Sequence, residues 1–339
     1  MKVIKRVLAA CGVIVLVWHG FFTSSAQEKI DTLTTDTNLV TVYLSVVDRQ
    51  TNFLTSLSRD DIKVYEDGIE QRISTFQQAT DRPVSIALLM DISGSERNTL
   101  SREKSAAKSF AAAVIQRPID QLAVISFAAD PFLEHSLTNT VKDADEAIER
   151  IGRIQGTQGY QGSGEILPAG SQPAGGTLSY TSAIWDAVWI TCRYVMAAQP
   201  LNSRKVVVLV TDGEDTSSRA NLDEAIDIAI KTDAMVYVIG IGDNSIADGV
   251  NRSTLSKLAT STGGQVFFPR KDEDLGKSFQ KIAQDLRSHY VVTYVPRRGN
   301  VSERSFREIR IELTNSSQRA RHKMFYRKGY YFPQTHVGT

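Results

Sequence analysis

Cysteine is scarce in this sequence, and neither sign of charge dominates it. The 339 residues include only Cys11 and Cys192 as cysteines, which excludes a disulfide framework and a zinc site built from clustered thiolates. There are 39 Lys and Arg against 38 Asp and Glu, a net charge of +1, so electrostatics give no reason to expect a nucleic-acid partner. The 42% of hydrophobic residues is typical of a globular protein and excludes a mostly disordered chain or one that crosses a membrane many times.

The sequence also lacks the motifs of common hydrolases and kinases. It has no G-x-S-x-G nucleophile elbow and no G-x-x-x-x-G-K-[ST] phosphate loop. The histidines beyond the first 26 residues lie apart from any serine or cysteine nucleophile motif; they are His135, His289, His322 and His336. These absences predict a protein that is not an enzyme, and a metal-dependent hydrolase remains an alternative.

Only one long apolar stretch occurs, and it lies at the amino terminus. Basic residues precede the apolar residues 7–22, and Ser24 and Ala26 then supply the small side chains of a signal-peptidase site. We expect residues 1–26 to be a signal peptide and residues 27–38 a flexible leader. The protein would then be exported to the periplasm or secreted. An uncleaved amino-terminal anchor is the alternative, and it would be the only attachment to a membrane.

Residues 83–287 alternate between apolar strand-like runs and amphipathic helical segments. The first run, V-S-I-A-L-L-M at 84–90, is apolar without interruption, as expected for a strand buried on both faces of a parallel sheet. Strands that alternate with helices build a doubly wound sheet with right-handed crossovers. We therefore predict an α/β domain with a mostly parallel sheet over residues 83–287.

The residues on both sides of this domain alternate in the manner of exposed antiparallel strands. The strand-like segments lie at 40–48, 62–66, 70–76, 289–295, 306–313 and 322–331. Three isolated strands cannot easily bury a core. We therefore expect residues 39–80 and 288–333 to pair into one small β-sandwich that the α/β domain interrupts. Two separate β modules remain the alternative.

Side chains with oxygen donors follow two of the predicted buried strands. D-I-S-G-S begins at Asp91, directly after the first apolar run, and T-D-G-E-D places Asp212 after a second one. Ligands of doubly wound sheets bind beyond the carboxyl ends of the strands. Carboxylate and hydroxyl oxygens suit Mg²⁺, which prefers octahedral oxygen coordination. Asp and Ser before a helix are also common N-caps, so D-I-S-G-S alone would be ambiguous. Asp212 at the end of a second strand strengthens the prediction of a metal site.

These motifs and their placement resemble a von Willebrand factor type A domain with a metal-ion-dependent adhesion site. The segments around D-D-I-K-V-Y-E-D-G and S-H-Y-V-V-T-Y-V-P are similar to a bacterial subgroup of exported proteins with such domains. The resemblance implies that Asp91, Ser93 and Ser95 bind the metal directly or through water and that Asp212 does so from its own loop. It also implies Mg²⁺ as the ion, with Mn²⁺ or Ca²⁺ possible.

The family pattern requires one further hydroxyl ligand, and here the sequence departs from it. T-S-A-I-W-D-A-V aligns with the subgroup pattern without a gap and puts Ser182 at the ligand position. Thr177 is the runner-up, and Thr181 is a third alternative. The resemblance assigns Asp215 and Ser217 supporting positions beside the ligands.

The resemblance implies a protein-binding or cell-adhesion module that recognises an Asp or Glu carboxylate of a partner through the bound ion. A structural or assembly domain with a vestigial metal site is the alternative. Residues 152–177 are rich in Gly, Gln, Ser and Pro and precede the helix after Ser182. We expect them to form a ligand-selecting lip at the rim of the metal site; an insertion without a role is the alternative.

Overall fold

The computed structural model describes most of the chain beyond residue 38. The described residues are 39–79, 82–93, 100–152, 165–166, 181–241, 251–270, 272–297 and 305–332. They belong to one compact unit, Asn38–Thr339. The predicted signal peptide and leader, together with Ser95, Thr177 and most of the expected lip, lie outside the described residues.

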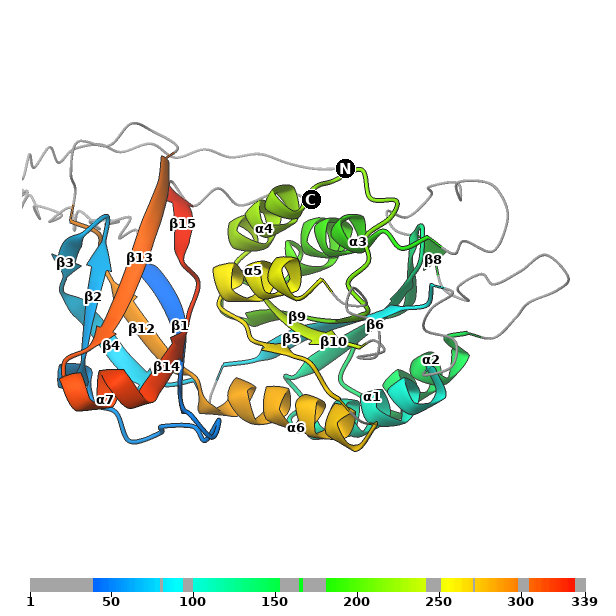
Figure 1. Ribbon diagram of the computed structural model, residues 1–339, viewed down its shortest axis with the longest axis horizontal. Coiled ribbons are helices and arrows are strands. Elements are labelled where there is room, and N and C mark those ends of the chain that lie inside the picture. Colours follow the sequence, from blue (N-terminus) through cyan, green and yellow to red (C-terminus); the bar gives the residue numbers. More distant parts are fainter. Residues whose placement is uncertain are drawn as a thin grey trace, which may run out of the picture. The chain divides into compact units, whose positions relative to one another are not determined.

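A seven-stranded sheet forms the centre of the α/β domain (Figure 1). The strand order is β11 (Val266–Phe267), β10 (Ala234–Gly240), β9 (Arg204–Thr211), β5 (Val84–Asp91), β6 (Gln121–Phe127), β7 (Pro131–Thr138) and β8 (Glu165–Ile166). The first five strands in this order are parallel, and β7 and β8 are antiparallel to their inner neighbours. Every residue of β5 is buried, as its apolar run predicts.

Helices cover both faces of this sheet. Figure 1 shows α1 (Leu100–Val114), α2 (Val141–Arg150) and α6 (Asp272–Ser288) on one face, and α3 (Ile184–Ile190), α4 (Leu222–Lys231) and α5 (Arg252–Thr262) on the other. Alternate side chains of β5 enter the two cores: Leu88 packs in the core of α1 and α6, and Leu89 packs in the core of α3, α4 and α5. The predicted doubly wound fold is confirmed.

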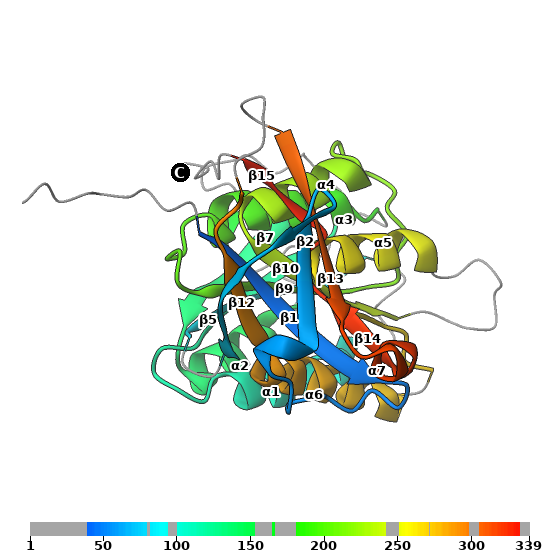
Figure 2. The same ribbon diagram turned by 90° about the vertical axis from the view of Figure 1, so that its left-hand side faces the viewer.

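The chain on either side of the α/β domain forms two four-stranded sheets. One has the order β14 (His322–Phe325), β1 (Val40–Asp48), β12 (Tyr290–Tyr294), β4 (Ile73–Gln78); the other has the order β15 (Gly329–Phe332), β13 (Ser305–Leu313), β2 (Ile62–Glu66), β3 (Ile69–Gln71). Figure 2 shows the two sheets overlapping, and their side chains share one core that includes Leu44, Val64, Val292 and Ile311. The predicted sandwich of amino- and carboxyl-terminal strands is confirmed.

Two predicted strands are each divided between the sheets. The segment expected at 70–76 contains the end of β3 and most of β4, and the segment at 322–331 contains β14 and most of β15. In each case the first half pairs in one sheet and the second half in the other. Strands that bend at a corner and change sheets help to close a sandwich. The short helices Arg59–Asp61 and α7 (Ser316–Arg321) were not expected.

The α/β domain leaves and rejoins the sandwich at neighbouring strands. β4 precedes it and β12 follows it, and these strands pair in antiparallel fashion. Beyond the end of this ladder, the Ala79 backbone N–H donates a hydrogen bond of 2.8 Å to the carbonyl oxygen of His289. The two ends of the inserted domain therefore lie side by side.

Two further observations concern the helices. A π-helical segment, Thr191–Met196, continues α3 and carries Cys192. This thiol is fully buried, and burial raises its pKa to about 12, so it is unreactive at neutral pH. Among the described residues, no helix has the length and apolar composition needed to cross a membrane.

Candidate metal site

The carboxyl ends of β5 and β9 bring the first predicted site residues together. Asp91 is the last residue of β5, and Thr211 is the last residue of the neighbouring parallel strand β9, so Asp212 follows at the same edge of the sheet. The side chain of Asp91 is completely buried, and Asp212 is 6% exposed. This edge is where doubly wound sheets bind their ligands.

Three groups from different parts of the chain hold the carboxylate of Asp91. Its Oδ2 accepts hydrogen bonds from Ser182 Oγ at 2.8 Å and from Thr211 Oγ1 at 2.7 Å. Its Oδ1 accepts one from the backbone N–H of Ser93 at 3.0 Å. Ser93 and Ser182 are themselves buried. The carboxylate therefore has a fixed orientation at the end of β5.

The electrostatics of this cluster favour a positive charge. Burial raises the pKa of Asp91; the hydrogen bonds from Ser93, Thr211 and Ser182 lower it in part, and the negative charge of Asp212 raises it again. A buried carboxylate beside a second negative charge, as Asp91 is, is costly to keep ionised without a cation.

The loop after β9 positions Ser182. Its backbone N–H donates to Thr216 Oγ1 at 2.9 Å, and its carbonyl oxygen accepts from the backbone N–H groups of Thr216 at 2.8 Å and Ser217 at 3.1 Å. Asp215 accepts from the backbone N–H of Ile184 at 2.8 Å and so satisfies an otherwise unpaired donor at the start of α3. Ser217 thus contacts the carbonyl oxygen of Ser182, and Asp215 contacts the backbone two residues further along the chain.

Sequence reasoning missed three hydroxyl residues of this cluster. Thr211 bonds the Asp91 carboxylate directly, Thr216 holds the Ser182 backbone, and Ser218 Oγ accepts from the backbone N–H of Trp185 at 3.0 Å. The signal was present, because Thr211 directly precedes Asp212 and residues 216–218 read T-S-S.

Comparison with known proteins identifies the family. The family model of the von Willebrand factor type A domain matches residues 85–282 of this chain. The chain belongs to this family. The search of the curated proteins found no match.

Several solved structures are similar to the chain. Proximal thread matrix protein 1 of the mussel byssus is 18% identical, with a TM-score of 0.48 over 66% of this chain and 51% of that one. A second structure of the same mussel protein has a zinc-occupied metal-ion-dependent adhesion site (MIDAS) motif. It is 18% identical, with a TM-score of 0.45 over 62% of this chain and 49% of that one. A von Willebrand factor type A protein of Catenulispora acidiphila is 13% identical, with a TM-score of 0.45 over 88% and 74%. The chain spans about half the length of the mussel protein.

The donor set of this von Willebrand factor type A domain fits a hard divalent cation. Its polar side chains are carboxylates and hydroxyls, which are the oxygen ligands that Mg²⁺ and Ca²⁺ prefer. Within the described ranges, no three His, Cys, Asp or Glu side chains gather into a metal-binding group. A cation at this site would therefore need the serine hydroxyls as well as Asp91 and Asp212.

Proposed function

We propose that this protein is an exported protein-binding module that holds a divalent cation at the carboxyl edge of its α/β sheet. The proposed ligands are Asp91, Ser93, Ser95, Ser182 and Asp212, with Thr177 as the alternative to Ser182. Mg²⁺ is the proposed ion, and Mn²⁺ and Ca²⁺ are the alternatives. The observation that carries the proposal is the buried pair of carboxylates, Asp91 and Asp212, in a shell of hydroxyl groups.

The bound ion would supply an electrophilic position that accepts an Asp or Glu carboxylate of a partner protein. The chain's own residues prepare that position. Asp91 is oriented by three hydrogen bonds, so little conformational entropy remains to be lost when a ligand binds. Ser93 and Ser182 offer neutral oxygens, which leaves the two carboxylates as the only anionic donors of the proposed set.

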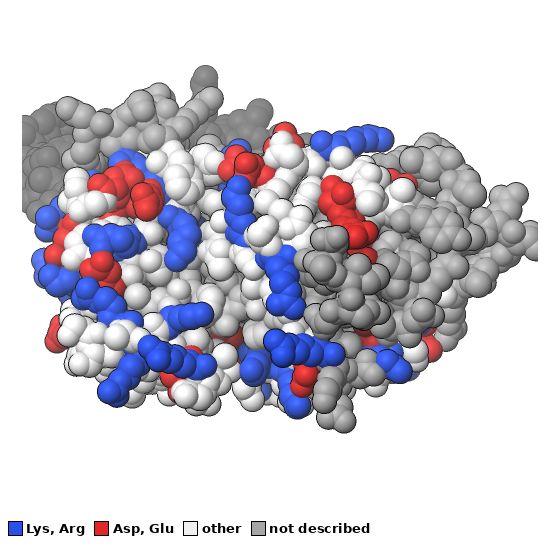
Figure 3. Space-filling view, in the orientation of Figure 1, with Lys and Arg blue, Asp and Glu red and all other residues white. Residues whose placement is uncertain are grey.

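Surface charge is compatible with a protein partner. Figure 3 shows Lys and Arg side chains interspersed with Asp and Glu side chains over the described part of one face. The net charge of the sequence is +1. A mixed surface of this kind favours recognition through a localised site over long-range attraction to a polyanion. We propose no role for nucleic acid.

The experiment that tests the metal site is thermal unfolding of the full chain in Mg²⁺ and in EDTA. A ligand at 100 times its Kd stabilises the folded state by about 2.7 kcal/mol when it binds that state alone. We expect Mg²⁺ to raise the Tm of the wild-type protein and of a control variant, Asp223→Ala, whose exposed carboxylate pairs with Lys257. Asp91→Ala and Asp212→Ala should remove the rise. No rise with Mg²⁺, Mn²⁺ or Ca²⁺ would reject the site.

A second candidate function is that of a structural or assembly domain with a vestigial metal site. The hydrogen bonds from Ser182 and Thr211 to Asp91 favour it, because they join three segments of the chain directly. The two candidates differ in how partner binding responds to the metal. A partner that is captured in Mg²⁺ and released by EDTA supports the adhesion module, and one that is retained in EDTA supports the assembly domain.

A further inference from the structure

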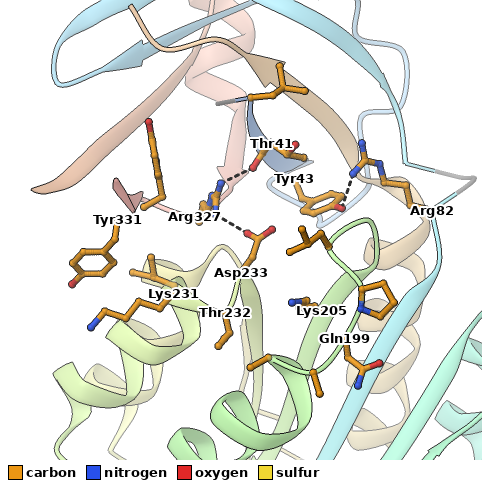
Figure 4. Close-up of a pocket in the computed structure, with 17 residues that line it drawn as sticks. Thr41, Tyr43, Arg82, Gln199, Lys205, Lys231, Thr232, Asp233, Arg327 and Tyr331 are labelled. Atoms are coloured by element: carbon orange, nitrogen blue, oxygen red, sulfur yellow. Dashed lines mark hydrogen bonds and ion pairs between the residues drawn. The ribbon is translucent and has the colours of Figure 1, made fainter. Parts of the chain in front are cut away.

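A polar cavity lies at the opposite end of the sheet from the candidate metal site. It has a volume of about 530 Å³, and its walls come from β1, β15, the start of β9, the end of α4 and the segment 197–201 (Figure 4). Lys205, one of its lining residues, is the second residue of β9, whereas Thr211 ends the same strand. The rise of an extended strand separates the two sites by about 20 Å.

The cavity carries more positive than negative charge. Its charged lining residues are Arg82, Lys205, Lys231, Arg327 and Asp233. Most of the cations have partners within the cavity wall. Arg327 donates to Asp233 Oδ1 at 2.6 Å and to the carbonyl oxygen of Thr41 at 2.7 Å, and Lys231 Nζ lies 4.8 Å from the centre of the Tyr331 ring. Arg82 donates a long hydrogen bond of 3.4 Å to the Tyr43 hydroxyl.

Lys205 differs from the other three cations. It is 5% exposed, and within the described part of the chain its ammonium group has no hydrogen bond and no ion pair. Burial lowers the pKa of Lys205, and the attraction of Asp233 opposes this only in part. Asp233 also accepts a hydrogen bond from Arg327. The ammonium of Lys205 faces the cavity (Figure 4), so an anion bound there would give it a charged partner that the described residues do not supply.

The other walls of the cavity are largely apolar. Leu39, Pro200, Leu201 and Ile230 line it, and Leu201 is 69% exposed and Leu39 44%. Covering exposed leucine side chains with an apolar part of a ligand removes apolar surface from water and so favours binding. The cavity therefore suits a molecule with an anionic group at one end and an apolar body at the other.

We propose that this cavity binds a small organic anion, a carboxylate or a phosphate monoester on an apolar body, with the anionic group against the ammonium of Lys205. The ligand contacts the sandwich through β1 and β15 and the α/β domain through β9 and α4, so its binding joins the two. This site is independent of the metal and of the function proposed for it.

The test is calorimetric titration of the full wild-type chain with three probes that share one body. These are 3-phenylpropionate, 2-phenylethyl phosphate and the uncharged 3-phenylpropanamide, which all carry a phenylethyl group. We expect at least one anion to bind with a Kd of about 1 mM or tighter, as befits a ligand of this size, and the amide to bind at least about tenfold more weakly, because it cannot form the charged hydrogen bond. The anion that binds more tightly shows whether the cavity prefers a carboxylate or a phosphate monoester. An amide that binds as well as the anions, or no binding by either anion, overturns the proposal.

Two variants locate the binding. Lys205→Met keeps an unbranched side chain only one atom shorter and removes its charge, and it should weaken anion binding by about tenfold or more. The control Lys257→Met removes an exposed lysine paired with Asp223 and should leave binding unchanged. Unchanged binding by Lys205→Met overturns the proposal. Should that variant not fold, a wild-type crystal soaked with the better anion decides: the anionic group lies within hydrogen-bond distance of Lys205 Nζ, or the proposal is wrong.

Discussion

Asp91 joins segments that are far apart in the sequence. The hydroxyls of Ser182 and Thr211 and the backbone N–H of Ser93 all donate to its one carboxylate. Because the residue is completely buried, a substitution there removes a proposed metal ligand and also leaves the donors without their acceptor. Effects on stability and on metal binding must therefore be measured separately.

Ser182 and Thr177 give different expected results in such a measurement. Ser182→Ala should reduce the Mg²⁺-dependent rise in Tm because it removes a proposed ligand, and it should also lower the Tm in EDTA because it removes a buried hydrogen bond worth about 1–2 kcal/mol. Thr177→Ala should change neither value. A larger loss of the metal effect in Thr177→Ala would show that the alternative alignment is correct.

Another buried carboxylate, that of Asp285, predicts a dependence of stability on pH. It accepts from the Tyr237 hydroxyl at 2.7 Å and lies beside His289, with Nε2 and Oδ1 3.6 Å apart. Burial alone would raise the pKa of Asp285, but the charge of His289 and the hydrogen bonds lower it below its usual 3.8. A folded-state pKa below the unfolded one stabilises the protein above the unfolded pKa, and this contribution is lost as the pH falls through the folded pKa.

Asp285→Asn should therefore destabilise the protein by about 1–3 kcal/mol at pH 7, and the difference from wild type should shrink at pH values below about 4. Denaturant unfolding at pH 7, 5 and 3.5 measures this. The exposed Asp223→Asn is the control and should change little at any pH. A difference that stays constant down to pH 3.5 would contradict the lowered pKa.

Among the elements, the end of α5 meets the corner between β14 and β15. Gly263 ends α5 with a φ of +93°, and a Cβ atom there would lie 2.5 Å from the backbone nitrogen of Arg327. Gly68, in the turn between β2 and β3, also has a positive φ of +80°, but a Cβ atom there meets nothing within 4 Å. A substitution at Gly68 therefore introduces backbone strain alone, whereas one at Gly263 introduces backbone strain and a steric clash.

We expect Gly68→Ala to cost about 1 kcal/mol, the penalty of a left-handed backbone for a residue with a side chain. Gly263→Ala should cost about 3 kcal/mol or more, because backbone atoms on both sides must also move apart. Denaturant unfolding of both variants compares them. Equal losses would mean that the helix end and the corner can separate at little cost.

The elements also show where sequence reasoning succeeds and where it ends. Apolar runs predicted β5 and β9 well, because each of these strands is determined by its own burial pattern. The division of the segment at 70–76 between β3 and β4 was not predictable, because it depends on which distant strand each half pairs with. The same holds for the site: D-I-S-G-S pointed to Asp91, whereas the bond from Thr211 arises only when β9 lies beside β5.

At the scale of the whole molecule, the α/β domain is an insertion between two paired strands. The sandwich core consists of residues from β1 to β4 and from β12 to β15, with a few side chains from the connecting segments. A chain in which Asn-Gly, a two-residue hairpin turn, replaces residues 80–288 should therefore fold. Far-UV circular dichroism with a β spectrum and a cooperative thermal transition would verify it. Residues 288–339 alone, the control, should stay unfolded, because they lack half of the core.

The same insertion determines the order in which the protein matures on the ribosome. The strands β1 to β4 emerge first, but their partners β12 to β15 follow only after about 210 residues of α/β domain, which take about 10–40 s to synthesise. During this interval the early strands have edges without their native neighbours, and such edges are prone to aggregate. The first half of the sandwich must therefore be kept apart from other chains until β12 to β15 have been made.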